Sequence, residues 1–156
     1  MREKIPEISV KIGEKLYVSN HQEELKIARE TLDQNVIEQA STYSWYAVLS
    51  VMLDEIVGTK KLEIDILYGK LYDEYKVKLM DQTGKATEGA IDSQIKQDEN
   101  YITAVVALNG AKRDKGIFDA IVRAFEHRRE MLVSLGHKVR KEMDGETYVK
   151  SQDRSG

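Results

Sequence analysis

Apolar residues recur every three or four positions along two long stretches of the chain. The first stretch, from about 21 to 80, has no proline and is rich in helix-forming residues. Its amphipathic stripe includes Leu25, Ala28, Leu32, Val36, Tyr43, Tyr46, Leu49, Leu53, Ile56, Leu62, Ile66, Leu67, Leu71 and Tyr75. A glycine at 58 is either tolerated or marks a break, because one glycine costs about 1 kcal/mol relative to alanine. The stretch predicts one very long helix or two helices in tandem.

The second stretch, from about 98 to 143, carries a heptad pattern typical of a coiled coil. Its predicted seam, in the core of the chain or of an oligomer, consists of Phe118, Ile121, Phe125, Arg128, Leu132, Leu135 and Val139. Arg128 is the unexpected member. A buried charge there could fix register or subunit number, as polar residues do in coiled coils. We favour the simpler interpretation that Arg128 snorkels to solvent at the edge of the seam.

Polar and glycine-containing segments separate and flank these stretches. Residues 8–12 alternate apolar and polar positions, and an apolar run at 16–18 follows Gly13 and Glu14, which indicates a small β-hairpin or an extended arm. Ser19 and Asn20 are candidate helix caps, in capping-box register with Gln22 and Glu23 respectively. Residues 81–90 are the clearest loop, and a short helix from about 91 is expected to follow it.

The predicted fold is all-α: a long antiparallel, coiled-coil-like helical hairpin with a short strand-like N-terminal arm. We expect an arm at 1–19, a helical domain at 20–143 and a frayed polar tail at 144–156. Two helices of this length bury little area per residue and leave apolar stripes uncovered. Self-association into a homo-oligomer is the expected way to complete the core.

Composition narrows the class of protein. The 156 residues, 17.8 kDa, correspond to one domain, with 41% apolar and 33% charged residues and a mean hydropathy of −0.50. The absence of cysteine excludes disulfides and thiolate chemistry and fits a reducing compartment. No apolar run approaches the ~18 residues of a membrane span. We therefore expect a cytoplasmic protein that does not associate with membranes.

The net charge of −3 conceals two oppositely charged strips. Residues 20–57 carry two basic and seven acidic side chains, whereas residues 110–141 carry nine basic and four acidic ones. Such asymmetry can join helices within a chain, join subunits, or present a cationic face to a polyanion.

The residues offer little support for catalysis, a metal or a cofactor, and we expect a protein that is not an enzyme. There is no phosphate-binding glycine motif, and the three histidines lack the spacing of metal ligands. An all-α, metal-dependent nucleotide pyrophosphatase would use clustered carboxylates, for which Glu63 and Asp65 are the candidates. Solvated helix-surface charges are the simpler interpretation of that pair.

Lysines and tyrosines interleave between about residues 60 and 78. Single-stranded nucleic acid is held by cations along its phosphates and by aromatic rings that stack on its bases. The candidate binding residues are Lys60, Lys61, Lys70, Tyr72, Tyr75, Lys76 and Lys78. By composition alone, a charged helix whose tyrosines pack against a partner helix explains the same pattern.

Two segments resemble a known family. The sequence Gln-Ala-Ser-Thr-Tyr-Ser-Trp-Tyr at 39–46 resembles the Ala…Leu-Tyr-Ser-Lys-Trp segment of the UvsY-like phage recombination mediators. The sequence Leu-Tyr-Gly-Lys-Leu-Tyr-Asp-Glu-Tyr at 67–75 is similar to that family's basic Leu-Lys-Ala-Arg-Leu-Asp-Tyr-Tyr stretch. A polar loop and a long closing helix follow in the same order, so the resemblance covers about 25–140. Tyr68 replaces the family's first basic residue, and Lys70 keeps the second.

The resemblance implies a non-enzymatic mediator of DNA recombination and repair. Such a protein binds single-stranded DNA as a homo-oligomer and helps load a RecA-like recombinase in place of a single-strand binding protein. It implies phosphate contacts from Lys70 and its neighbouring lysines, stacking on Tyr72 or Tyr75, and the host cytoplasm as location if the chain is phage-encoded. The alternative is a coiled-coil assembly or adaptor protein without nucleic-acid binding, in which the acidic strip neutralises the basic one. The pyrophosphatase is the third hypothesis.

Overall fold

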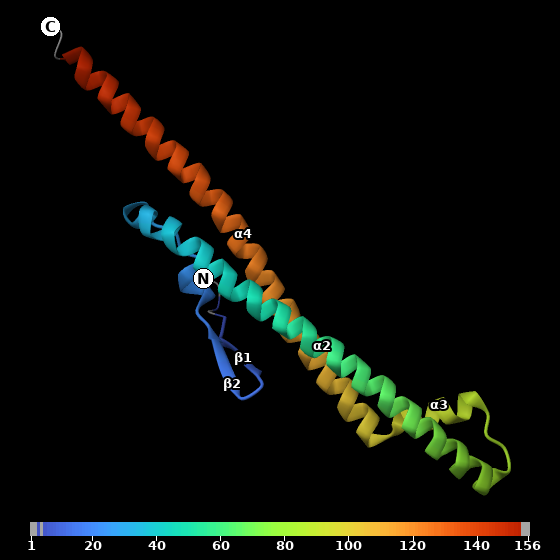
Figure 1. Cartoon of the computed structure of the whole chain (residues 1–156). Coiled ribbons are helices and arrows are strands. Elements are labelled where there is room, and N and C mark those ends of the chain that lie inside the picture. Colours follow the sequence, from blue (N-terminus) through green and yellow to red (C-terminus); the bar gives the residue numbers. More distant parts are fainter. Residues whose placement is uncertain (1–2, 4, 154–156) are drawn as a thin grey trace. The chain divides into compact units, whose positions relative to one another are not determined.

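The protein is described by a computed structural model that covers residue 3 and residues 5–153, with side chains described as far as Gly145. The elements are β1 (Ile8–Ile12), β2 (Lys15–Ser19), α1 (His21–Glu24), a 3₁₀ turn η1 (Arg29–Thr31), α2 (Leu32–Thr83), α3 (Glu88–Gln97) and α4 (Glu99–Asp153). Two long helices, α2 and α4, dominate, and β1 and β2 form a short N-terminal hairpin (Figure 1). The predicted all-α fold with a strand-like arm is confirmed.

The chain divides into two compact units, and each long helix contributes to both. Unit 1 combines the residues up to Leu49 with those from Phe118 onward, and unit 2 is Ser50–Ile117. In both units α2 and α4 pack antiparallel. Residue numbers rise along α2 while they fall along α4. The contacts of unit 1 include Asn35 with Arg128 and Gln39 with Phe125, and those of unit 2 include Asp54 with Lys115 and Tyr68 with Tyr101.

Several predicted boundaries were wrong. The first long helix begins at Leu32 and not near 21, because Ala28 adopts an extended backbone after the four-residue helix α1. Asn20 precedes α1 but makes no side-chain capping bond, so the capping box is absent. Helix α2 continues through Gly58 without a break, and α4 extends to Asp153, into the predicted tail.

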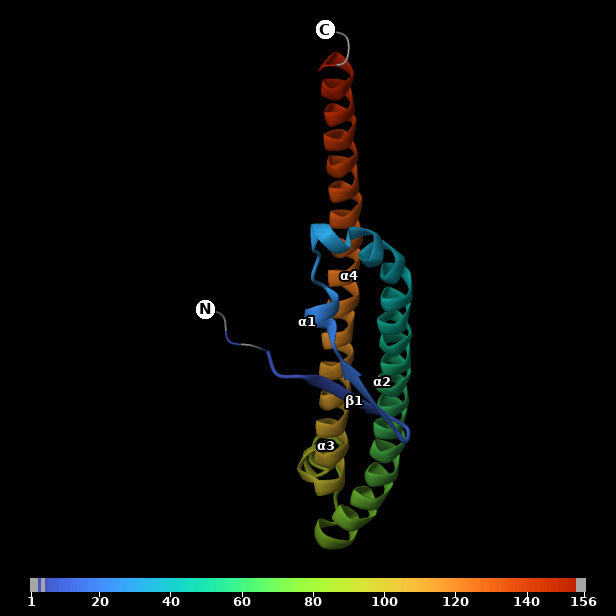
Figure 2. The same ribbon diagram turned by 90° about the vertical axis from the view of Figure 1, so that its left-hand side faces the viewer.

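Unit 1 has an aromatic core between its two helix segments. Tyr46, Phe118 and Phe125 are fully buried, and the rings of Tyr46 and Phe125 stack with centroids 5.0 Å apart. The hairpin pairs residues from Ile8 with Ser19 to Ile12 with Lys15, and Gly13 supplies the positive φ of its turn. In Figure 2 the segment that follows α1 passes across α4, and the carbonyl of Lys26 in that segment lies 3.4 Å from the Arg128 guanidinium of α4.

The hydroxyl of Tyr46 fastens the N-terminal arm to this core. It donates to the Glu24 carboxylate at 2.5 Å and accepts from the backbone N–H of Asn20 at 3.1 Å. It also lies 3.3 Å from the hydroxyl of Ser19, which in turn contacts Nδ1 of His21 at 2.6 Å. Burial and the bond to Glu24 raise the pKa of Tyr46 to about 12.

Arg128 does not snorkel, and the interpretation favoured from sequence was wrong. Its side chain is 5% exposed, although it carries a charge and no carboxylate pairs with it in the described part of the chain. The guanidinium donates to Gln39 Oε1 at 2.5 Å, to Asn35 Oδ1 at 3.0 Å and to the carbonyl of Lys26 at 3.4 Å. Neutral oxygens from two other segments therefore surround the charge, which lets it replace much of its lost hydration.

Burial lowers the pKa of Arg128, while the nearby charges of Glu38 and Glu24 raise it. Its Nε is buried without a hydrogen-bond partner among the described residues. At Arg128, polar bonds and not apolar packing therefore determine how the two helices of the seam align.

Unit 2 closes around the short helix α3. Leu71 of α2 and Ile91 and Ile95 of α3 form its buried cluster. Gly84, with a φ of +69°, ends α2, and its N–H bonds the Met80 carbonyl at 2.9 Å. The predicted loop at 81–90 is shorter than expected, because α2 runs to Thr83 and α3 already starts at Glu88.

Replacing Arg128 tests whether its polar bonds organise unit 1. Arg128→Met removes the donors and leaves oxygens of Gln39, Asn35 and Lys26 without partners, which should cost about 2–4 kcal/mol of unfolding free energy. Urea denaturation measures that loss, and amide exchange should show reduced protection in residues 20–31. The neighbouring exposed Arg129→Met is the matched control, with an expected change within about 0.5 kcal/mol. Equal effects of the two substitutions would contradict this role.

Candidate nucleic-acid interface

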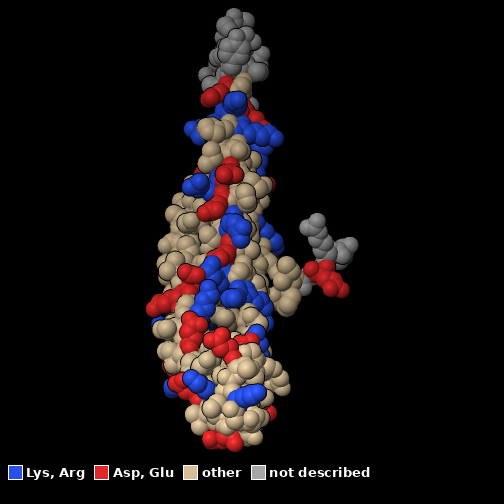
Figure 3. Space-filling model, turned by 90° about the vertical axis from the view of Figure 1, so that its right-hand side faces the viewer, with Lys and Arg blue, Asp and Glu red and all other residues tan. Residues whose placement is uncertain are grey.

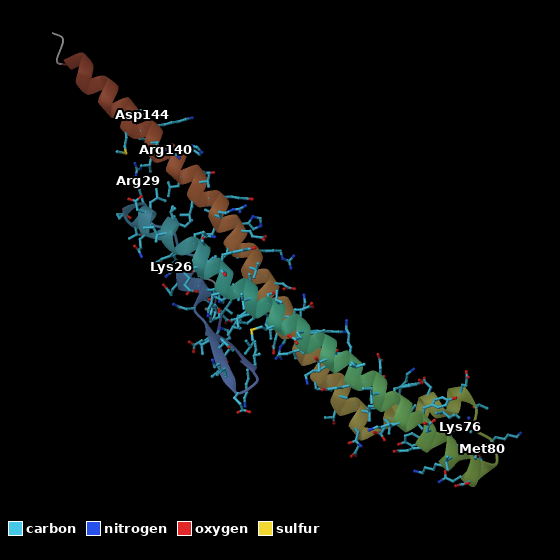
Figure 4. All side chains as sticks on the ribbon, in the orientation of Figure 1. Lys26, Arg29, Lys76, Met80, Arg140 and Asp144 are labelled. Atoms are coloured by element: carbon cyan, nitrogen blue, oxygen red, sulfur yellow. The ribbon has the colours of Figure 1, made fainter. Side chains whose placement is uncertain are left out.

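The five candidate lysines lie along the part of α2 that belongs to unit 2. Lys61, Lys70, Lys76 and Lys78 are exposed, and Lys60 is half-buried. Lys60 and Lys78 are 18 residues apart, which is five helical turns, so they share one face of α2. Lys76 projects from the last turns of that helix (Figure 4). The lysines are therefore accessible to a polyanion, but they are distributed around the helix.

Carboxylates are interleaved with these lysines. Residues 58–83 contain five lysines and five acidic residues, a net charge of zero. Lys70, the residue singled out by the family resemblance, has Asp73 and Glu74 one helical turn away. Its attraction for phosphate is weakened by that proximity.

The tyrosines of this segment pack within unit 2. Tyr68, Tyr72 and Tyr75 lie against the buried cluster of α2 and α3, and the rings of Tyr68 and Tyr101 meet edge-on with centroids 6.2 Å apart. The Tyr68 hydroxyl donates to Asp92 at 3.0 Å. This arrangement corresponds to the simpler interpretation of the lysine–tyrosine pattern, in which the rings pack against a partner helix.

Tyr75 and Asp98 form the best-defined polar contact of unit 2. The Tyr75 hydroxyl donates to Asp98 Oδ2 at 2.8 Å, while Asp98 Oδ1 accepts the backbone N–H groups of Asn100 and Tyr101 at 2.9 and 3.2 Å. Asp98 thus caps α4 and anchors α2 at once. The bond from Tyr75 is the largest influence and holds the pKa of Asp98 below its usual range; burial opposes it, and the two backbone bonds lower the pKa further. Lys78 Nζ lies 5.7 Å from the centre of the Tyr75 ring.

A further set of exposed cations lies on α4 and was not assigned to the site from sequence. In unit 2 it comprises Lys112 and Arg113, and in unit 1 it comprises Arg123, Arg129, Lys138, Arg140 and Lys141. Figure 3 shows basic side chains gathered on α4 next to the grey residues. Residues 131–141 contain Lys138, Arg140 and Lys141 and no acidic residue. This run without acidic residues could have identified the α4 cations from the sequence. The charge count over the wider strip, residues 110–141, includes four acidic residues and therefore hid it.

The seam residues lie where α4 faces the rest of its own unit. Five are buried (Phe118, Ile121, Phe125, Arg128 and Leu132), and two are half-buried (Leu135 and Val139). They are used within the chain, so an oligomer would need another surface.

The basic residues at 110–141 stay largely exposed in the described part of the chain. Asp54 and Lys115 form an ion pair of 3.8 Å, close to the limit for such a contact. Seven of the nine basic residues in 110–141 are exposed. The neutralisation expected of a purely structural basic strip is therefore incomplete at the α4 surface.

Other candidate chemistry is not assembled in the described part of the chain. Glu63 and Asp65 are both exposed on α2. Among the described residues, no three His, Asp or Glu side chains are grouped to hold a metal ion. None of the described helices has the length and apolar character needed to cross a membrane.

The contact between Tyr75 and Asp98 predicts a specific pH dependence. A carboxyl group whose pKa is lowered on folding adds stability above its ordinary pKa of about 4, and that stability is lost as the pH falls through the lower, folded value. Tyr75→Phe should raise the pKa of Asp98, measured by NMR titration, and reduce the acid sensitivity of unit 2. Tyr72→Phe, from the same cluster, is the control and should leave the pKa of Asp98 in place. An unchanged pKa in Tyr75→Phe would show that the hydroxyl does not act on Asp98.

Comparisons of the chain with protein-family models, with curated proteins and with solved structures found no match. The resemblance to the UvsY-like mediators consequently stays an expectation from sequence, and any functional proposal depends on the placement of the chain's own charged and aromatic residues.

Proposed function

We propose that this protein is a non-enzymatic, single-stranded-DNA-binding mediator of recombination that acts as a homo-oligomer and helps load a RecA-like recombinase in place of a single-strand binding protein. The observation that carries the proposal is the exposure of the α4 cations, above all Lys138 and Lys141, which lie in a run from 131 to 141 that contains no acidic residue. Glu142, the acidic residue that follows this run on α4, is bonded to Arg29, so Lys138 and Lys141 stay available to a phosphate backbone.

The α2 lysines supply additional, weaker contacts. Because acidic residues match them in number, a single chain offers modest affinity for a polyanion. An oligomer repeats the same contacts along one strand, and the effective concentration of each further contact is then high. Self-association and DNA binding are therefore linked in this proposal.

The tyrosines take a positioning role in the proposed function. Tyr75 is bonded to Asp98 and lies beside Lys78, so its ring helps to hold that lysine at the helix surface. Binding should accordingly depend more on salt than on base identity, because phosphate contacts carry no sequence information.

A coiled-coil assembly protein without nucleic-acid affinity is the second candidate. The zero net charge of residues 58–83 and the packing of Tyr68, Tyr72 and Tyr75 within unit 2 favour it. This candidate predicts self-association with no binding of oligonucleotides at physiological salt, which separates it from the mediator.

Salt-dependent DNA binding is the primary test. Fluorescence anisotropy with a labelled strand of ~30 nucleotides should show affinity that falls linearly in log salt, with little sequence preference. The double variant Lys138→Ala/Lys141→Ala should weaken binding on the order of tenfold and reduce the salt slope by up to about 1.4 per chain. Lys85→Ala removes an exposed loop lysine of the same charge and is the control. The absence of binding at low salt would refute the mediator and favour the assembly protein.

Lys70 is tested separately, because the resemblance alone singled it out. Lys70→Ala should lower oligonucleotide affinity by a few-fold, less than the α4 double variant, since Asp73 and Glu74 already weaken its interaction with phosphate. The same anisotropy titration measures the change. If affinity and salt slope both stay at their wild-type values, Lys70 makes no phosphate contact.

A further inference from the structure

The two sides of the α2–α4 pair in unit 1 are unequally covered. On one side, the N-terminal arm lies against α2: the ring of Tyr17 contacts that of Trp45 with centroids 6.3 Å apart, and the backbone of Asn20 bonds Tyr46. On the other side of the same turns of α2, Val36, Ala40 and Tyr43 face away from the arm. No segment among the described residues covers that side.

A groove runs along the uncovered side, and its apolar side chains gather in its upper part. Its lower part is lined by Ala40, Tyr43, Glu126 and Glu130, and its upper part by Val36, Ala40, Leu132, Val133, Gly136 and Arg140. Gln39, Ala40 and Arg129 line both parts, so the two parts are continuous. Val36 and Val133 are 54% and 55% exposed, which is costly for aliphatic side chains unless something covers them.

Charges along the α4 wall of this groove are self-complementary. Glu126, Val133 and Arg140 are spaced seven residues apart and therefore share one face of α4. The acidic and the basic residue lie about 10.5 Å on either side of the apolar centre, at 1.5 Å per residue. If a second copy runs antiparallel across Val133, each Glu126 meets the Arg140 of the other copy, and the two valines meet on the axis.

Both charged groups are available for such a contact. The Glu126 carboxylate accepts the exposed Tyr43 hydroxyl at 3.3 Å, which holds it over the groove. Arg140 bonds only weakly to the carbonyl of Gly136, at 3.5 Å, and pairs with no carboxylate among the described residues. Figure 4 shows Arg140 on the stretch of α4 that faces the segment carrying Arg29. Arg29 itself is engaged by Glu142, which leaves Arg140 free.

We propose that the occupant of this groove is a second copy of the chain, bound antiparallel about a two-fold axis at Val133, with two symmetric Glu126–Arg140 pairs. Such an interface uses the same patch twice, as two-fold dimers do. It covers the exposed valines and leaves the seam within each chain intact. The inference specifies the self-association on which the proposed function depends, but its tests contain no DNA, so either can fail without the other.

Single cysteines test the symmetry directly, because the chain has none of its own. In the Val133→Cys variant, the two introduced cysteines face each other across the proposed axis. Mild oxidation or a short bismaleimide should link them about tenfold faster than in the control variant. The reason is that a disulfide needs its two residues within about 7 Å. The control is Met131→Cys, on the same helix, similarly exposed at 62%, and lining a different cleft together with His127 and Lys138. Equal crosslinking rates in the two variants would overturn the proposal.

A charge exchange tests the pairing of Glu126 with Arg140. Glu126→Arg and Arg140→Glu should each weaken the dimer on the order of tenfold by sedimentation equilibrium, because each creates two like-charge contacts. The double variant Glu126→Arg/Arg140→Glu restores opposite charges and should recover most of the affinity. Circular dichroism confirms that each variant stays helical. A double variant as weak as the single ones, or a wild-type chain that sediments as a monomer, would refute the interface.

Discussion

The guanidinium of Arg128 lies inside the seam between α2 and α4, and the rest of unit 1 is arranged around it. A buried charge without a carboxylate partner needs several oxygens within reach, and these come from Lys26, Asn35 and Gln39. The bond to the Lys26 carbonyl uses a backbone oxygen from the stretch in which the chain is not helical. The bond gives this stretch before Leu32 a polar partner on α4 and helps to hold the N-terminal arm against the helices. Apolar packing from Tyr46, Phe118 and Phe125 supplies most of the buried area, whereas Arg128 restricts which alignment of the helices satisfies every polar group.

In unit 2, the alignment of α2 with α4 depends on a carboxylate at the end of the helix pair, that of Asp98. Asp98 accepts the first free N–H groups of α4 and the Tyr75 hydroxyl, so one side chain fixes where α4 begins and how α2 lies beside it. The tyrosines that suggested base stacking are used for this packing. The proposed DNA contacts therefore depend on the lysines of α2 and on the exposed cations of α4, and they gain strength chiefly by repetition in an oligomer.

The use of the seam within the chain constrains how copies associate. Phe118, Ile121, Phe125 and Leu132 are already buried, so a partner has to cover other apolar side chains. The groove that contains Val36 and Val133 offers such exposed apolar side chains, on the side of the helix pair that the N-terminal arm does not cover. The order of Glu126, Val133 and Arg140 along α4 makes this surface complementary to a copy of itself.

The sequence by itself determined the helical class, a strand-like N-terminal arm and the heptad seam. Periodicity of apolar residues reports which face of a helix is buried, whatever it is buried against. The tertiary structure decided the start of α2, the length of the 84–87 turn and the state of Arg128. The start of α2 and the state of Arg128 depend on contacts between residues about 100 positions apart, such as Arg128 with Lys26, which local patterns do not contain. The same limit applies to the site: the lysine–tyrosine pattern was visible, but only the packing around α3 revealed that Tyr68 and Tyr75 bond to Asp92 and Asp98. The sequence shows which donors and acceptors the side chains carry, whereas the tertiary structure determines which groups they bond.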